Sequence, residues 1–250
     1  MLAELPRRAD REPVVGTGMG GDETTAIDAA VERSVVARFD AGESDYTLVS
    51  EELGHRGEGD GVWIVLDPID GSINAKRGLP FFSLSVAVAV GGTMDDVVFG
   101  FVYDFGTGEE WTAERGGGAR LNGVLLDGDR PKDEIEILAL EATRTDLVAI
   151  HTPPLVGLVQ RLRIFGSLAI SLCHLADGRV DGVCSLKAAR AVDIAAAQLL
   201  VRERGFAIDL FEAPAPSRFG KAPLDVEGRS RVVAAGTDEL CAQIAAALSA

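Results

Sequence analysis

The chain has 250 residues, of which 47% are hydrophobic and 25% charged, and its formal net charge is −15. This composition is typical of a globular protein with one or two domains, and it excludes disordered, collagen-like and disulfide-rich chains. The strong negative charge argues against broad binding to nucleic acid or to an anionic membrane, since both depend on contacts with phosphate groups. The longest uncharged apolar stretch, residues 79–92, is too short to cross a bilayer and alternates as a strand does.

The cysteines and the first residues bear on cellular location. Cys173, Cys184 and Cys241 form no CxxC pair, so neither a zinc ribbon nor a disulfide framework is indicated. Residues 1–13 mix arginine with acidic residues and lack the apolar core of a secretory signal. We therefore expect reduced thiols and a cytoplasmic protein.

Residues 1–130 predict an α+β domain with an antiparallel sheet. After an irregular glycine-rich start, apolar residues at helical spacing predict a helix over 25–39, and Thr25 followed by Asp28 resembles a capping box. Residues 62–66 form a continuous apolar run, which is typical of a buried strand. Residues 80–90 alternate, with Ser and Ala on one side that are small enough to receive a helix. Further strands are expected over 46–49, 97–103 and 109–112.

Residues 131–250 predict an α/β domain. The polar segment 128–131 marks the boundary between the two domains. Beyond it, strands and helices alternate, and Thr237 is a candidate N-cap. Strands are expected over 135–141, 180–185, 206–210 and 231–234, with a short one before residue 168, and helices over 155–162, 168–176, 193–204 and 237–248.

The chemically informative segment is an acidic constellation. Glu51 and Glu52 precede Asp67 by about sixteen residues, and Asp67 opens the sequence D-P-I-D-G-S. Pro68 bars helix before it, so we expect the chain to turn and bring Asp67 and Asp70 to one side of the end of a buried strand. Carboxylates that suit Mg²⁺, beside free backbone N–H groups that suit an anion, are what a phosphate-ester hydrolase needs.

A plain surface turn is the alternative for this segment, since D-P-x-D-G is favourable turn chemistry. The upstream glutamates and the buried strand that ends at two acids favour a functional site, because acids in such a place need partners.

These residues resemble those of a known family. D-P-I-D-G-S, the upstream E-E pair and the downstream V-D-I-A-A-A are similar to the motifs of the inositol monophosphatase superfamily, whose members are Mg²⁺-dependent sugar phosphatases and include fructose-1,6-bisphosphatases. The resemblance runs from residue 21 to the C-terminal helix. It implies a layered αβαβα sandwich, which agrees with the two halves described above.

The resemblance implies a set of metal ligands. Glu51, Asp67 and the carbonyl of Ile69 would bind one metal ion, and Asp67, Asp70 and Asp193 would bind a second, with a third, weaker ion leaning on Glu51. We expect two or three Mg²⁺ per site, with Mn²⁺ able to substitute. The alternative for Asp193 is an ordinary acid at the start of a helix, where acidic residues are common. The Trp that usually precedes this Asp in the family is Val192 here.

The resemblance also implies how water and phosphate would be held. Asp28 would pair with Ser72 to activate the attacking water, Glu51 would assist through its metal, and the N–H groups of Gly71 and Ser72 would hold phosphate oxygens, with Asn74 as a further substrate contact. For Asp28, a role as a helix-capping acid is the alternative.

Substrate preference rests on basic residues near Asp193. Members selective for inositol phosphates have a Glu seven residues before that Asp, where this chain has Leu186, followed by Lys187 and Arg190. Cations favour a second phosphate, as in archaeal-type members that cleave fructose 1,6-bisphosphate and also accept inositol 1-phosphate. An ordinary basic surface loop is the alternative.

Other functions stay open on the sequence. They are a phosphatase selective for inositol phosphates, one acting on a nucleotide such as 3′-phosphoadenosine phosphate or NADP, and a non-catalytic regulatory protein. We expect a small sugar phosphate as the partner, no nucleic acid or membrane, and a homodimer, with a tetramer as the alternative.

Overall fold

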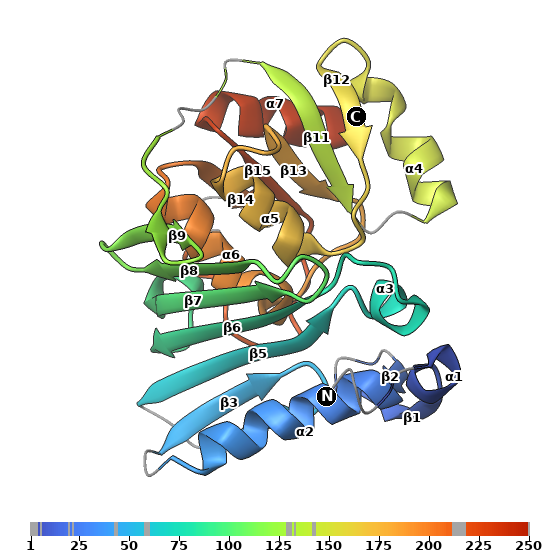
Figure 1. Cartoon of the computed structure of the whole chain (residues 1–250). Coiled ribbons are helices and arrows are strands. Elements are labelled where there is room, and N and C mark those ends of the chain that lie inside the picture. Colours follow the sequence, from blue (N-terminus) through green and yellow to red (C-terminus); the bar gives the residue numbers. More distant parts are fainter. Residues whose placement is uncertain are drawn as a thin grey trace.

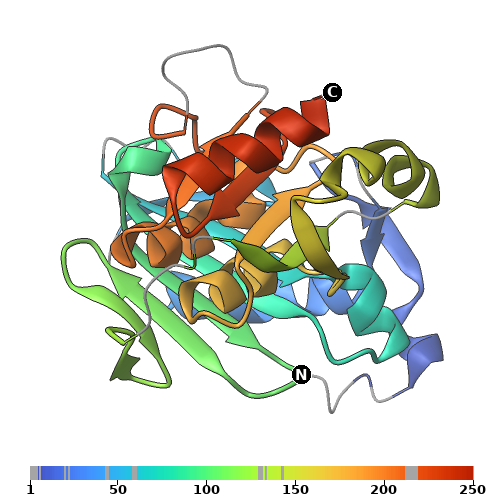
Figure 2. The ribbon, with the colours of Figure 1, turned by 90° about the horizontal axis from the view of Figure 1, so that it is seen from above.

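Five alternating layers of helix and sheet make up the chain in a computed structural model (Figure 1). The structure describes residues 5, 7–19, 21, 23–42, 45–57, 61–128, 132, 134–141, 144–211 and 219–249. A second view shows the small sheet and its helices lying across the large sheet (Figure 2). The layering confirms the α+β, αβαβα sandwich that the sequence predicts.

The large sheet belongs to the first half of the chain, and its strand order is β10-β9-β8-β7-β6-β5-β3-β4. All neighbouring strands are antiparallel except β3 and β5, which are parallel, so the sheet is antiparallel as predicted apart from this one pair. The strands are β3 (Tyr46–Ser50), β4 (Gly54–Arg56), β5 (Val62–Asp70), β6 (Ser83–Val90), β7 (Val97–Asp104), β8 (Glu110–Glu114), β9 (Gly118–Leu121) and β10 (Val124–Leu125).

The small sheet belongs to the second half, and its order is β12-β11-β13-β15-β14. The first three strands are parallel, as in an α/β unit, whereas β15 runs antiparallel to both of its neighbours. The strands are β11 (Ile135–Glu141), β12 (Val159–Arg163), β13 (Gly182–Ser185), β14 (Ala207–Leu210) and β15 (Val232–Ala235).

Helices form the other three layers. Helix α2 (Ala26–Asp40) packs on the outer face of the large sheet, α5 (Leu168–Ala176) and α6 (Ala191–Glu203) lie between the sheets, and α7 (Asp238–Ser249) covers the small sheet. The remaining elements lie at the periphery: α1 (Arg8–Arg11), the hairpin β1 (Val14–Thr17) and β2 (Glu23–Thr25), α3 (Ser72–Arg77), α4 (Thr145–His151), and the 3₁₀ turns η1 (Met94–Asp96) and η2 (Pro153–Leu155). None of the helices in the described ranges is both long and apolar enough to span a membrane.

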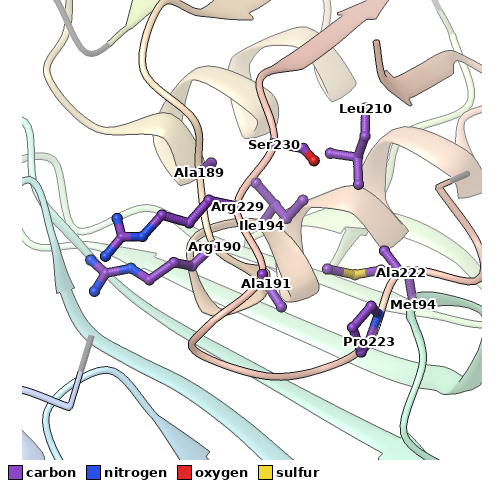
Figure 3. Close-up of a pocket in the computed structure, with 11 residues that line it drawn as sticks. Met94, Ala189, Arg190, Ala191, Ile194, Leu210, Ala222, Pro223, Arg229 and Ser230 are labelled. Carbon is purple, nitrogen blue, oxygen red and sulfur yellow. The ribbon is translucent and has the colours of Figure 1, made fainter. Parts of the chain in front are cut away.

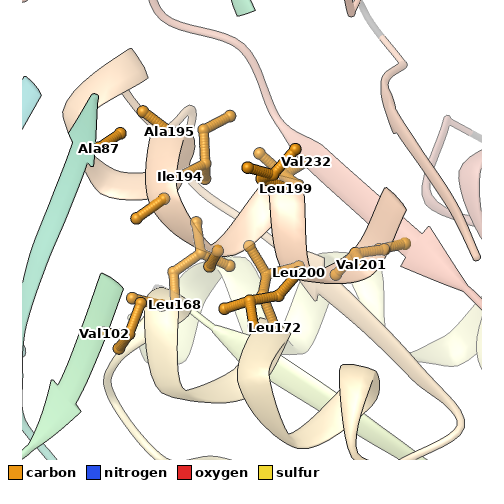
Figure 4. Packing of buried hydrophobic residues seen from close by; sticks show 14 of the residues in the cluster. Ala87, Val102, Leu168, Leu172, Ile194, Ala195, Leu199, Leu200, Val201 and Val232 are labelled. Atoms are coloured by element: carbon orange, nitrogen blue, oxygen red, sulfur yellow. The ribbon is translucent and has the colours of Figure 1, made fainter. Parts of the chain in front are cut away.

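The central core explains why β6 carries small residues. Ser83, Ser85, Ala87 and Ala89 are at most 1% exposed on the face that receives α5 and α6, as the alternation predicted. On the neighbouring strand, Gly100 pairs with Ala87, and α6 passes so close that a Cβ on Gly100 would lie 2.5 Å from the Ala196 carbonyl oxygen. Larger residues of α5 and α6 fill the remaining space (Figure 4).

Two local predictions were wrong. The helix expected over 155–162 is a turn followed by β12, because Pro153 and Pro154 confine the chain to a 3₁₀ turn and Gly157 adopts a φ of +88°. The turn expected at Asp67 is also absent, since β5 continues to Asp70. The strands β1 and β2 flank the glycine-rich start and were not predicted. The boundary predicted between residues 130 and 131 falls on a segment, 129–131, outside the described residues, and the division into domains stays a prediction.

Candidate active site

The parallel pairing of β3 and β5 brings the first two acids together. Ser50 pairs with Leu66, so the next residues, Glu51 and Asp67, follow at the same end of neighbouring strands. Asp67 is 2% exposed, and its Oδ1 accepts a hydrogen bond of 3.0 Å from the N–H of Ile69. Burial, and then the negative charge of Glu51, raise the pKa of Asp67 well above its usual value.

A bulge in β5 places Asp70 on the same side as Asp67. Asp67 pairs with Ser85 and Asp70 with Ser83, so three steps along β5 oppose two along β6. The extra residue cancels the normal alternation, which would have put the two carboxylates on opposite faces. Burial raises the pKa of Asp70 to about 7, although a hydrogen bond from Ser167 opposes this change.

Asp193 completes the acidic set from the other half of the chain. It lies in the first turn of α6, where its Oδ2 accepts a hydrogen bond of 2.8 Å from the N–H of Arg190. Arg190 contacts both Asp193 and Glu51, and the negative charge of Asp193 raises the pKa of Glu51, Asp67 and Asp70. The pKa of Glu51 reaches about 8, mainly because the group is buried.

Arg190 supplies positive charge to this set. Its guanidinium forms an ion pair with Glu51, and its Nε lies 3.6 Å from Oδ1 of Asp193. Arg190 is 7% exposed, and it extends beside Arg229 at one end of a small cavity of about 80 Å³ (Figure 3). This cavity is lined mostly by apolar residues and is too small for a sugar phosphate, since small-molecule pockets measure roughly 300 Å³ or more.

Asp28 caps a helix and also keeps one oxygen available. Its Oδ2 accepts hydrogen bonds from the N–H (3.0 Å) and the hydroxyl (2.5 Å) of Thr25, so the predicted capping box is present. Its Oδ1 is buried without a hydrogen-bond partner among the described residues. Ser72 donates to the carbonyl of Ile69 at 3.0 Å, and in the described ranges no hydrogen bond joins it to Asp28.

The segment after Asp70 packs closely against the other half. Gly71 has a φ of +94°, and a Cβ there would lie 2.8 Å from the Phe81 carbonyl oxygen, so no other residue fits. Asn74 donates through Nδ2 to the carbonyls of Phe81 (2.8 Å) and Phe165 (2.7 Å). Its amide nitrogen is therefore engaged in holding the two halves of the chain together.

Leu186 and Lys187 lie in different environments, although they are neighbours in the sequence. Leu186 is 3% exposed and packs in the apolar cluster on the outer side of the small sheet. Lys187 is exposed directly after it. The structure therefore brings Glu51, Asp67, Asp70, Asp193 and Arg190 together, whereas Lys187 lies on the surface.

Several contributors escaped the sequence reasoning. Ser167 and the N–H of Ala169 each donate to Asp70 Oδ2 at 2.6 Å. Glu32, one helical turn after Asp28, accepts hydrogen bonds from the Ser50 hydroxyl and, at 3.1 Å, from the N–H of Leu53. The i, i+4 spacing of Asp28 and Glu32 was a visible signal, but the partners of Ser167 lie too far away in the sequence to be anticipated.

The donor set fits a hard divalent cation in its chemistry. Carboxylate oxygens are the ligands that Mg²⁺ prefers. Here the negative charges of Glu51, Asp70 and Asp193 raise the pKa of Asp67, an effect that a bound cation would reverse. In the part of the chain that the structure describes, no three such side chains are already grouped around one point. Instead, the Arg190 guanidinium balances Glu51 and Asp193, and it would have to withdraw as a cation bound.

Comparisons with known proteins agree with this chemistry. The model of the inositol monophosphatase family matches residues 5–250. The fructose-1,6-bisphosphatase/inositol-1-monophosphatase of Methanothermobacter thermautotrophicus is 32% identical and covers 96% of this chain and 91% of that protein. Nus factor SuhB of Pasteurella multocida is 35% identical over 74% of this chain and 70% of its own length.

Solved structures agree as well. The crystal structure of an inositol monophosphatase-fructose 1,6 bisphosphatase has a TM-score of 0.84 at 29% identity, covering 99% of this chain and 93% of that one. An inositol monophosphatase of Thermotoga maritima has a TM-score of 0.74 at 27% identity, with 91% and 85% covered. The chain thus belongs to the inositol monophosphatase family, and it is a phosphoric monoester hydrolase of the metal-dependent sugar phosphatase class.

Proposed function

We propose that this phosphatase depends on Mg²⁺ and removes the 1-phosphate of fructose 1,6-bisphosphate, and that it also hydrolyses inositol 1-phosphate. The observation that carries the proposal is the convergence of Glu51, Asp67, Asp70 and Asp193, drawn from both halves of the chain, beside the arginine Arg190. Acids alone would suit any phosphomonoester, whereas the arginine favours a substrate with a second phosphate.

The acids would hold the cations. Glu51, Asp67 and the Ile69 carbonyl would bind one Mg²⁺, and Asp67, Asp70 and Asp193 a second, with Mn²⁺ able to substitute. Bound Mg²⁺ would supply a water of lowered pKa and would stabilise the leaving oxygen. Asp67 is 2% exposed, so its carboxylate is shielded from solvent that would otherwise compete for the cation.

Other residues of the chain would position water and phosphate. The free Oδ1 of Asp28 is the atom suited to accept a hydrogen bond from the attacking water, while Oδ2 stays bound to Thr25. Ser72 would turn its hydroxyl from the Ile69 carbonyl toward that water. The N–H groups of Gly71 and Ser72 would hold phosphate oxygens.

Arg190 would meet the distal phosphate once cations are bound. In the described structure its guanidinium balances Glu51 and Asp193. A divalent cation at these acids would take over that balance, and the guanidinium would then pair with an anion. Exposed Lys187 would add charge at the entrance, and the oxygen of Asn74 would accept from a substrate hydroxyl. The relatives named fructose-1,6-bisphosphatase/inositol-1-monophosphatase support this substrate pair.

Phosphate release tests the proposal directly. Fructose 1,6-bisphosphate and inositol 1-phosphate would be assayed in parallel, with Mg²⁺ and with EDTA. We expect Mg²⁺-dependent release from both, faster from the bisphosphate. Release from inositol 1-phosphate alone would support the metal chemistry but contradict the role of Arg190 in binding a second phosphate. If neither substrate releases phosphate, 3′-phosphoadenosine phosphate and NADP would be tested next.

A regulatory role is the second candidate, because relatives from three different bacteria carry the name Nus factor SuhB. A scaffold with no working site should not be stabilised by Mg²⁺, so a thermal shift with Mg²⁺ separates the two functions. We further propose that the enzyme acts in the cytoplasm as a homodimer, with a tetramer as the alternative.

A further inference from the structure

Glu141 is a buried acid that lies outside the carboxylate set. It is the last residue of β11 and is 2% exposed. Its Oε1 accepts hydrogen bonds from the N–H of Phe165 (3.1 Å) and the hydroxyl of Ser171 (2.6 Å), and its Oε2 accepts one from the N–H of Gly166 (2.8 Å). One carboxylate therefore satisfies two backbone donors of the same loop and one side chain of the helix that follows.

Residues 165–169, which include the first two residues of α5 and are called loop 165–169 below, reach across to the first half of the chain. Ser167 and the N–H of Ala169 hold Oδ2 of Asp70, each at 2.6 Å. The Phe165 carbonyl accepts Nδ2 of Asn74 at 2.7 Å. Gly166 has a φ of +83°, and a Cβ there would lie 2.7 Å from Asn74 Nδ2. A larger residue at position 166 would therefore push the loop away from Asn74.

The chain of contacts from Glu141 to Asp70 is short and continuous. Glu141 sets the backbone at residues 165 and 166, and the next residue, Ser167, orients the Asp70 carboxylate. Without a carboxylate at position 141, two backbone N–H groups would lose their acceptor in a partly buried loop, and the loop would move to recover one. The Asp70 carboxylate would then no longer be held in its present orientation toward Asp67 and Asp193.

We propose that Glu141 is a positioning residue for cation binding, acting through loop 165–169 on Asp70. This inference rests on the proposed Mg²⁺ site. A merely structural glutamate would affect stability and leave cation affinity unchanged, whereas a positioning residue changes the affinity itself, typically by 10–100-fold for groups that orient a metal ligand.

The test measures Mg²⁺ binding by titration calorimetry, independently of activity, in the full chain. Glu141→Gln keeps the size of the side chain but places an amide donor opposite one backbone N–H. We expect the Kd for Mg²⁺ to rise about ten-fold, with the KM for sugar phosphate at saturating Mg²⁺ within twofold of wild type. A lower Tm with an unchanged Kd would overturn the proposal.

Asp181→Asn is the matched control. Asp181 has a side chain that is 8% exposed, and its Oδ2 accepts the N–H of Ile137 on the same strand, β11, at 2.9 Å. Among the described residues it makes no hydrogen bond or ion pair with loop 165–169, so the substitution should lower Tm and leave the Kd within twofold of wild type. A Kd raised as much as in Glu141→Gln would mean that any weakening of β11 acts on the site, which contradicts a specific role for Glu141.

A double-mutant cycle then tests the route. Ser167→Ala removes the hydroxyl that holds Asp70, and the combined variant should weaken Mg²⁺ binding by less than the product of the single effects, because both act on one contact. Multiplicative effects would contradict the route. If Glu141→Gln does not fold, Ser171→Ala removes one donor to Glu141 and should raise the Kd about three-fold, and an unchanged Kd would count against the proposal. If wild-type protein binds no Mg²⁺, the proposed function itself has failed.

Discussion

The guanidinium of Arg190 pairs with the carboxylate of Glu51, although the two residues are 139 positions apart in the sequence. Arg190 immediately precedes α6 in the second half, and Glu51 immediately follows β3 in the first. Both side chains are shielded, with exposed fractions of 8% and 15%. This contact links the two halves at the acidic site and supplies positive charge where cations would bind.

Replacing this arginine should separate the two substrates. We expect Arg190→Ala to raise the KM for fructose 1,6-bisphosphate roughly ten-fold, since one charge-assisted contact is worth about 1.5 kcal/mol or more. The KM for inositol 1-phosphate should stay within twofold, because that substrate has no distal phosphate. Arg202→Ala is the control, since Arg202 lies on the same helix and pairs with Asp95 at the surface. Equal KM changes for both substrates would argue against a distal-phosphate role.

Asp67 is the acid that both cations would share. Asp67→Asn should lower kcat by about three decades or more at saturating Mg²⁺, since an amide is a weak ligand for a hard cation. In EDTA the same variant should have a higher Tm than wild type, because it removes a buried acid whose pKa is raised by burial and by Glu51. Near wild-type turnover would refute the ligand assignment, and a lower Tm in EDTA would refute the charge argument.

Glu32 stabilises the turn that carries Glu51. Its carboxylate is 4% exposed and accepts hydrogen bonds from Ser50 and Leu53 on either side of that turn. Glu32→Gln should lower the free energy of unfolding by about 1–3 kcal/mol, because one buried donor loses its acceptor. Urea denaturation would measure the change, with the exposed helix residue Glu239 changed to Gln as the control. Equal stability in the two variants would contradict the role given to Glu32.

His174 should make the protein sensitive to acid. It is 8% exposed between the rings of Trp111 and Phe165, and burial, followed by the charge of Arg179, lowers its pKa to about 4. Because the native state resists protonation, the stability it contributes is present above pH 6.5 and is lost as the pH falls toward 4. The stability difference between wild type and His174→Phe should change by on the order of 3 kcal/mol between pH 7 and pH 4. Parallel pH curves for the two proteins would show that His174 is not responsible.

Gly100 marks the closest approach between the large sheet and α6. Gly100→Ala should lower the free energy of unfolding by about 1–3 kcal/mol, because the new methyl group would meet the Ala196 carbonyl and neither backbone can move without disturbing the core. Gly61→Ala is the control, since a Cβ there meets nothing within 4 Å. Thermal denaturation of both variants would measure the difference, and similar Tm values would mean that α6 can shift.

Much of the secondary structure could be predicted from short-range patterns in the sequence. Strand β11 and helix α5 have the predicted bounds, 135–141 and 168–176, because period-two and helical patterns of apolar residues depend only on which side of an element is buried. The capping box at Thr25 and Asp28 could be predicted for the same reason, since its partners are three residues apart. The acidic motif and its family resemblance likewise needed no knowledge of distant contacts.

Only the tertiary structure decided how the acids meet. The parallel register of β3 and β5 sets Glu51 beside Asp67, and a bulge turns Asp70 to the same side. Ser167 and Arg190 reach these acids from the second half of the chain, over 97 and 139 residues. Strand register and interlayer packing arise from the whole core, in which each contact depends on many others, so no local pattern of residues encodes them.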